Sequence, residues 1–137
     1  MDNASPASKA TPPKGTVLIV DDTPDNLKLL SGLLKESYKV KVANNGRKAL
    51  EIAAAAPVPD LILLDVVMPE MDGYEVCAAL KGAPETRDIP VIFLTGRAEE
   101  SDRERGFAMG AVDYIAKPVD PPAVLQRVAA RMPALPA

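Results

Sequence analysis

Short apolar runs alternate along the chain with segments whose apolar residues recur at helical spacing. The runs at 16–20, 60–65 and 89–95 are nearly continuous, as in strands buried on both faces of a parallel sheet. Residues 38–43 alternate apolar with polar side chains, which is typical of a strand with one more exposed face. A further strand is expected at 111–117. The pattern therefore contains five candidate strands.

Each candidate strand is followed by a candidate helix. In the first helix, Thr23 suits the N-cap and Pro24 the first helical position, and leucines recur every three or four residues. The expected helices cover 23–37, 44–56, 71–82, 99–110 and 121–132. Five strands that alternate with helices predict a doubly wound α/β fold, with a five-stranded parallel sheet and helices on both of its faces.

The composition suits one compact domain between two short flanking segments. Of 137 residues, 47% are hydrophobic and 26% are charged, as in ordinary globular domains. Residues 1–15 are rich in Ala, Pro, Ser and Thr and lack the apolar stretch of a signal peptide, so we expect a disordered leader there. We expect the folded domain at 16–132, and a tail or the start of a linker at 133–137.

Two residue types narrow the possible chemistry. The chain has no histidine, which removes the Ser-His-Asp triad and most zinc sites. Its single cysteine, Cys77, cannot form an intramolecular disulfide, and we expect it to pack on a helix face as a small apolar side chain. No apolar run is long enough to span a membrane, and the net charge of −3 gives no sign of nucleic-acid binding. We therefore expect a cytoplasmic domain that contacts neither nucleic acid nor membrane.

Polar residues stand at the carboxyl ends of four candidate strands. The first strand ends in Asp21 and Asp22, the third in Asp65, the fourth in Thr95 and the fifth in Lys117. Each residue alone has a structural explanation, as a helix cap, a turn residue or a solvated charge. In a parallel sheet, however, the carboxyl ends of the strands meet at one edge, where ligands bind. The sequence thus predicts a cluster of carboxylates, a hydroxyl and an ammonium group.

A definite chemistry fits this cluster. Several carboxylates with open coordination suit Mg²⁺, a hard cation that is often shared with a phosphate group. A carboxylate beside the metal can act as a nucleophile and form an aspartyl phosphate. A lysine and a threonine can then bind the phosphoryl oxygens and offset their charge. The metal and the lysine would also reduce the repulsion between the carboxylates.

Four motifs place this cluster in a known context. They are "VDD" at 20–22, "LLDVVMPEMDG" at 63–73, "FLTG" at 93–96 and "DYIAKP" at 113–118. With these motifs in order on successive strand ends, the chain resembles the receiver domain of two-component response regulators over about 16–132. The resemblance implies the CheY-like, flavodoxin-like (βα)5 fold. It also implies a phosphorelay role, in which the domain accepts a phosphoryl group from a sensor histidine kinase or a phosphotransfer protein.

The resemblance also assigns the metal and phosphorylation site. By resemblance, Asp65 is the phosphoacceptor and a metal ligand, and Asp22 binds Mg²⁺ directly. Asp21 would hold a metal-bound water, and the backbone carbonyl of Val67 would complete the protein ligands. Lys117 would hold the phosphoryl group. The domain would catalyse its own phosphorylation and dephosphorylation, and would not act as a conventional turnover enzyme.

The same resemblance assigns a switch. Thr95 would move to bond the phosphoryl group, and Tyr114 would turn inward into the space that Thr95 leaves. A cis bond is expected before Pro118. The output surface would comprise 97–110, the fifth strand and the last helix, and would signal to an output domain or a downstream effector, with homodimerisation as one possible mode. With Val67 and Arg97 near the site, we expect a moderately stable phosphoryl group.

Three other classes of protein could carry some of these features. A phosphohydrolase of the haloacid-dehalogenase type would carry two aspartates separated by one residue, whereas Asp21 and Asp22 are adjacent. A nucleotide- or flavin-binding module would need a glycine-rich phosphate loop, which the chain lacks. A receiver-like module that is never phosphorylated fits poorly with the complete set of polar strand ends. The motifs at 21–30 and 59–77 look like those of receivers that precede cyclic-dinucleotide enzymes or sit in hybrid kinases.

Overall fold

A computed structural model describes residues 15–96 and 100–132 of the chain. The expected leader before Gly15, the expected tail at 133–137 and Arg97 lie outside these residues. Among the residues described, no helix is both long and apolar enough to cross a lipid bilayer.

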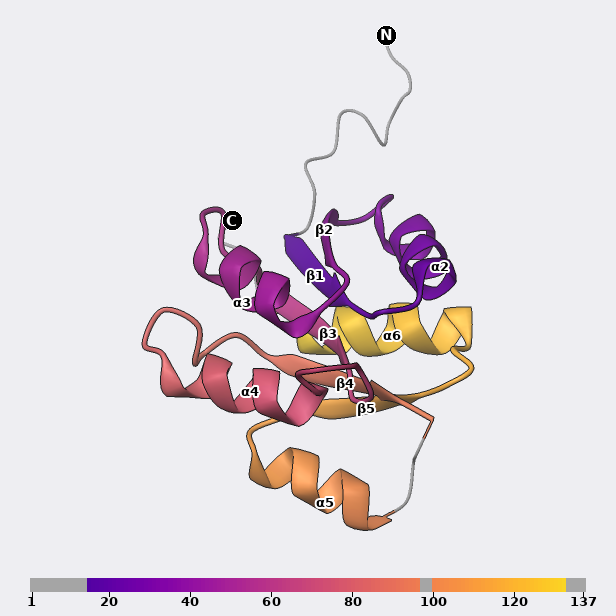
Figure 1. The fold of residues 1–137 in the computed structure, drawn as a ribbon. Helices are drawn as coiled ribbons and strands as arrows, with labels where there is room; N and C mark the ends of the chain where they lie inside the picture. Colours follow the sequence, from indigo (N-terminus) through magenta and orange to yellow (C-terminus); the bar gives the residue numbers. More distant parts are fainter. Residues whose placement is uncertain (1–14, 97–99, 133–137) are drawn as a thin grey trace, which may run out of the picture.

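The described chain folds around one five-stranded parallel sheet (Figure 1). The strands are β1 (Thr16–Val20), β2 (Lys39–Ala43), β3 (Leu61–Asp65), β4 (Val91–Thr95) and β5 (Asp113–Ala116). Their spatial order is β2-β1-β3-β4-β5, and every neighbouring pair is parallel. The predicted fold class is confirmed. The order reverses direction between β1 and β3, which is where ligands bind in such sheets.

Helices cover both faces of this sheet (Figure 1). They are α2 (Pro24–Leu34), α3 (Gly46–Ala54), α4 (Gly73–Gly82), α5 (Glu100–Ala108) and α6 (Pro121–Arg131). Helices α2 and α6 lie on one face, and α3, α4 and α5 lie on the other. Each helix lies within the range that the sequence predicted for it.

Alternation along the strands divides the core into two halves. In β1, Val17 and Ile19 pack toward α2 and α6, whereas Leu18 and Val20 pack toward α3 and α4. Both sets are fully buried, which explains why β1 reads as a continuous apolar run. Strand β2 lies at the sheet edge and keeps several half-exposed or exposed side chains, as its alternating sequence predicted. Cys77 is buried in α4, as expected for a small apolar side chain.

Strands β2, β3, β4 and β5 each begin one or two residues later than the sequence predicted, and β5 also ends one residue earlier. Strand β4 begins at Val91 and not at Ile89, because Pro90 has no N–H to donate to the sheet. Thr23 is the N-cap residue of α2, but its side chain makes no capping hydrogen bond. Its backbone N–H instead donates to Asp21 Oδ1 at 2.9 Å. The start of α2 is therefore tied to the end of β1 by a carboxylate.

Candidate functional site

The sheet register brings the polar strand ends together. Val20 pairs with Leu64, so the residues that follow them, Asp21 and Asp65, lie next to each other. The backbone N–H of Asp21 still donates to Ala43 on β2, at 3.2 Å. This bond extends the sheet pattern by one residue beyond β1, so it fixes where the Asp21 side chain leaves the sheet.

On the other side of β3, the last strands place the hydroxyl and the ammonium group. Thr95 ends β4 and is buried at 2% exposure. The backbone N–H of Lys117 donates to the Thr95 carbonyl at 2.9 Å, which places Lys117 just past the end of β5. The Lys117–Pro118 peptide bond is cis, as expected. The structure thus brings together at one sheet edge all the strand-end residues that the sequence singled out.

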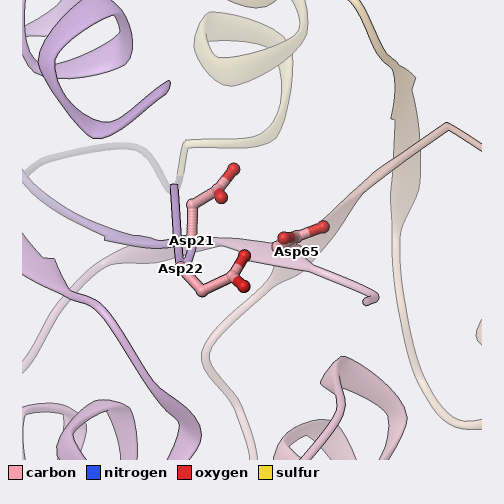
Figure 2. A group of neighbouring side chains, drawn as sticks. All are labelled: Asp21, Asp22 and Asp65. Atoms are coloured by element: carbon pink, nitrogen blue, oxygen red, sulfur yellow. The ribbon is translucent and has the colours of Figure 1, made fainter. Parts of the chain in front are cut away.

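Three carboxylates form the acidic part of the site (Figure 2). One oxygen from each of Asp21, Asp22 and Asp65 lies within 4.8 Å of the other two. Asp21 and Asp65 are buried, while Asp22 is exposed. Oxygen ligands from two strands, open to solvent on one side, fit the preference of Mg²⁺ for carboxylates and retained waters. The donor set therefore fits the metal.

Lys117 bridges the two buried carboxylates. Its Nζ lies 3.1 Å from Asp21 Oδ2 and 3.0 Å from Asp65 Oδ1. Burial lowers the pKa of Lys117, but the hydrogen bonds and the charges of Asp65 and Asp21 outweigh this and raise the pKa overall. Lys117 therefore stays a cation, and one ammonium group serves two carboxylates.

The pKa of the Asp65 carboxyl group lies above its usual range. Burial is the main cause that raises the pKa of its carboxyl group to about 6, and the nearby charge of Asp21 adds to the rise. Lys117 and the backbone N–H of Val67, which lies 3.4 Å from Asp65 Oδ1, act in the opposite direction. A cation bound beside Asp65 would favour the charged, nucleophilic form.

The loop from β3 to α4 folds back over Asp65. Gly73 N–H donates to the Val66 carbonyl at 2.8 Å. A Cβ at position 73 would lie only 2.8 Å from Val66 Cα, so only glycine permits this close approach. Helix α4 then starts with a capping box between Asp72 and Glu75. Val67, whose carbonyl is the expected metal ligand, is held at the exposed outer side of the loop.

The expected switch residue Tyr114 lies in the inward position. Its side chain is 5% exposed and packs against Phe93 and Phe107, with ring centroids 5.5 and 5.4 Å away. Its hydroxyl lies against Gly106 of α5, where a Cβ would overlap it and come within 2.6 Å of Tyr114 Cζ. Gly106 therefore provides the space that Tyr114 fills. Sequence reasoning assigned no packing role to Gly106.

Two further residues near the site were not singled out from the sequence. Asn26 of α2 donates from Nδ2 to Asp21 Oδ2 at 3.2 Å. Its position in the first helical turn after Asp21 and Asp22 could have indicated from the sequence that it lies near them. Arg105 of α5 lies over the ring of Tyr74 at 4.1 Å from its centroid, and this stacking links α5 to the start of α4. No spacing rule in the sequence could have found that pair, because its members lie on separate helices.

Comparison with known proteins agrees with this geometry. A "probable cyclic di-GMP phosphodiesterase" of Vibrio cholerae is 53% identical over 82% of this chain. The response regulator PleD of Caulobacter vibrioides is 45% identical over the same share. The chain spans 25% of the length of each of these two relatives.

Solved structures show the same fold. The chemotaxis protein CheY4 of Vibrio cholerae superposes with a TM-score of 0.82 at 31% identity, over 86% of this chain and 98% of that one. The receiver domain of sensor histidine kinase PA1611 from Pseudomonas aeruginosa superposes at 0.75 with 33% identity, over 86% and 96% of the two chains. That structure has a magnesium ion coordinated in its active-site cleft.

The family model for the response regulator receiver domain matches residues 17–129. This range contains the five strands except Thr16, the first residue of β1. It also contains all three aspartates of the acidic site. The chain belongs to the response regulator receiver domain family.

Proposed function

We propose that this receiver domain accepts a phosphoryl group on Asp65 in an Mg²⁺-dependent reaction. The observation that carries the proposal is the position of the Asp65 carboxylate, within 4.8 Å of two other carboxylates and 3.0 Å from Lys117 Nζ. Asp21, Asp22, Asp65 and the Val67 carbonyl would hold the metal. When bound, Mg²⁺ would offset the negative charge of the transferring phosphoryl group.

Each side chain of the site would then have its own role in the transfer. An Asp65 oxygen attacks phosphorus as the bond to the donor's imidazole nitrogen or acyl oxygen breaks, and the donor keeps the bonding electrons. Lys117 moves from the carboxylates to a phosphoryl oxygen. Thr95, next to Lys117 in the sheet, donates its hydroxyl to another phosphoryl oxygen. Lys117 and Thr95 therefore bind the group that Asp65 receives.

Movement of Thr95 would transmit the signal. Tyr114 pairs with Phe93, two residues before Thr95 on β4, and contacts α5 through Gly106 and Phe107. A change at Thr95 would therefore reach the surface formed by α5, β5 and α6. We propose that a histidine kinase or phosphotransfer protein supplies the phosphoryl group in the cytoplasm, and that an output domain or effector protein reads this surface.

The test is a phosphorylation assay with acetyl phosphate and Mg²⁺, read by intact-protein mass spectrometry. We expect one acid-stable, base-labile phosphoryl adduct per chain, lost in Asp65→Asn and without Mg²⁺. The matched control Asp88→Asn changes an exposed aspartate just before the amino end of β4, whereas the site lies at the carboxyl ends of the strands, and it should keep the adduct. Steady turnover of many phosphate esters would indicate a hydrolase. The absence of an adduct with any donor would contradict the proposal.

A further inference from the structure

Asp21 is a fully buried carboxylate with three donors around it. The side chain has no exposed surface. Oδ1 accepts a hydrogen bond from the Thr23 N–H at 2.9 Å. Oδ2 accepts one from Asn26 Nδ2 at 3.2 Å and pairs with Lys117 Nζ at 3.1 Å. A buried carboxylate is costly unless such partners satisfy it, so each donor matters to this group.

One of these donors is shared with the reacting residue. Lys117 Nζ lies 3.0 Å from Asp65 Oδ1, and the proposed function needs the same ammonium group on the incoming phosphoryl oxygens. As Lys117 moves toward that group, Asp21 Oδ2 loses its cationic partner. Asn26 is the other side-chain donor to this oxygen among the described contacts. Asn26 would therefore keep Asp21 hydrogen-bonded while Lys117 is engaged elsewhere.

The first turn of α2 holds Asn26 in place next to Asp21. It occupies the first turn of α2, and its backbone N–H donates to the Thr23 carbonyl at 3.1 Å. Thr23 is itself bonded to Asp21 Oδ1. The first turn of α2 thus holds both oxygens of Asp21, one through backbone and one through the Asn26 amide. The amide adds no charge to the site, so it orients the carboxylate without competing with a bound cation.

We propose that Asn26 is a positioning residue for the phosphorylation site. It fixes the rotamer of Asp21, keeps the remaining lone pairs of this carboxylate toward the metal, and allows Lys117 to leave Asp21 for the phosphoryl group. The claim that Lys117 can leave Asp21 rests on the proposed function. The claim that Asn26 orients Asp21 for metal binding can be tested without phosphorylation.

The variant Asn26→Leu has a side chain of similar size that cannot donate a hydrogen bond to Asp21. Because changes in residues that orient metal-binding carboxylates weaken metal affinity by about 10- to 100-fold, we expect the Mg²⁺ dissociation constant to rise about tenfold in titration calorimetry. The phosphorylation rate with acetyl phosphate should also fall at saturating Mg²⁺. Asn26→Gln, which keeps an amide on a longer stem, should restore part of both quantities.

The control is Asn44→Leu, the same change at an exposed asparagine whose side chain contacts Asn45. It should leave both quantities unchanged. If Asn26 only stabilised the helix start, Asn26→Leu would lower the melting temperature and leave the Mg²⁺ dissociation constant within twofold of the parent, which would overturn the proposal. A parent protein that binds Mg²⁺ but forms no adduct would refute the proposed function and leave the metal-binding part of the Asn26 proposal testable.

Discussion

Two charge clusters at β5 have opposite compositions. At the carboxyl end, one cation, Lys117, lies 3.1 and 3.0 Å from two carboxylates, Asp21 and Asp65. At the amino end, one carboxylate, Asp113, lies 2.7 Å from Arg127 and 3.5 Å from Arg131 on α6. The two carboxylates at the carboxyl end are 0% and 4% exposed, whereas the two arginines are nearly half exposed.

The difference shows how burial changes what a charge cluster can do. Water screens the cluster of Asp113, Arg127 and Arg131 (the arginine cluster). Its excess positive charge therefore changes the stability of the fold only slightly. The cluster of Lys117, Asp21 and Asp65 (the lysine cluster) is largely removed from water and carries more negative than positive charge, and Asp22 adds to that excess. It therefore gains from any further cation and responds to protonation. Four predictions test this contrast, from the largest effect to the smallest.

Removal of the shared cation should have the largest effect. In Lys117→Met, two buried carboxylates lose their counter-charge, so the free energy of unfolding should fall by about 3 kcal/mol at pH 7 in EDTA. Urea denaturation followed by circular dichroism measures this. If Lys117→Met were as stable as the parent protein, the lysine cluster would be no more sensitive than a surface ion pair.

Magnesium should stabilise only one of the two clusters. At a concentration one hundred times its dissociation constant, Mg²⁺ should add about 2.7 kcal/mol to the free energy of unfolding relative to EDTA. Asp22→Asn should lose most of this increase, because it removes the exposed carboxylate of the site. Asp113→Asn is the matched control and should keep the full increase. An equal response in both variants would show that Mg²⁺ binds elsewhere.

The buried site should also make stability depend on pH. Burial is the main cause that raises the pKa of Asp65 to about 6, above its ordinary value of 3.8. Between these two values the folded state binds more protons than the unfolded state, so stability falls as pH rises. In EDTA, we expect a loss on the order of 2 kcal/mol between pH 4 and pH 7, measured by urea denaturation at each pH. Asp65→Asn should flatten this part of the profile.

The exposed cluster should give the smallest effect. Arg127→Met makes a cation-to-methionine change like that of Lys117→Met, but at an exposed pair, and should cost less than about 1 kcal/mol. Addition of 0.5 M salt, an amount well above that in a standard buffer (~0.1 M), should reduce even this difference. A loss as large as that of Lys117→Met would mean that exposure is not what separates the two clusters.

The site could be predicted from the sequence because strands that run in the same direction place their last residues at the same edge of the sheet. Parallel strands end at the same edge, so Asp21, Asp65 and Lys117 had to converge once three apolar runs were recognised as strands. The same logic predicted the fold, since each strand needs a crossover helix before the next. These predictions depended on periodicity and order, which a sequence carries directly.

Other features depend on contacts that no local pattern encodes. The stacking of Arg105 on Tyr74 and the space that Gly106 leaves for Tyr114 arise from packing between elements far apart in the chain. Thr23 is the N-cap residue as predicted, and the absence of a hydrogen bond from its side chain has a related cause. A sequence pattern suggests a cap, but the Asp21 carboxylate reaches the Thr23 N–H, and the Thr23 side chain makes no capping bond. Competition between nearby donors and acceptors is settled only in three dimensions.

The two ends of the described domain meet at the sheet edge opposite the acidic site. A side chain added at Gly15 would overlap with Met132 and Asp60. The first and last residues that the structure describes are therefore neighbours. Chain termini that lie close together favour insertion into other proteins and circular permutation. A short linker from 132 to 15, with new termini opened between the exposed Pro84 and Glu85, should therefore leave the acidic site intact. The fold therefore keeps the two ends of the described chain on the opposite side of the sheet from the acidic site.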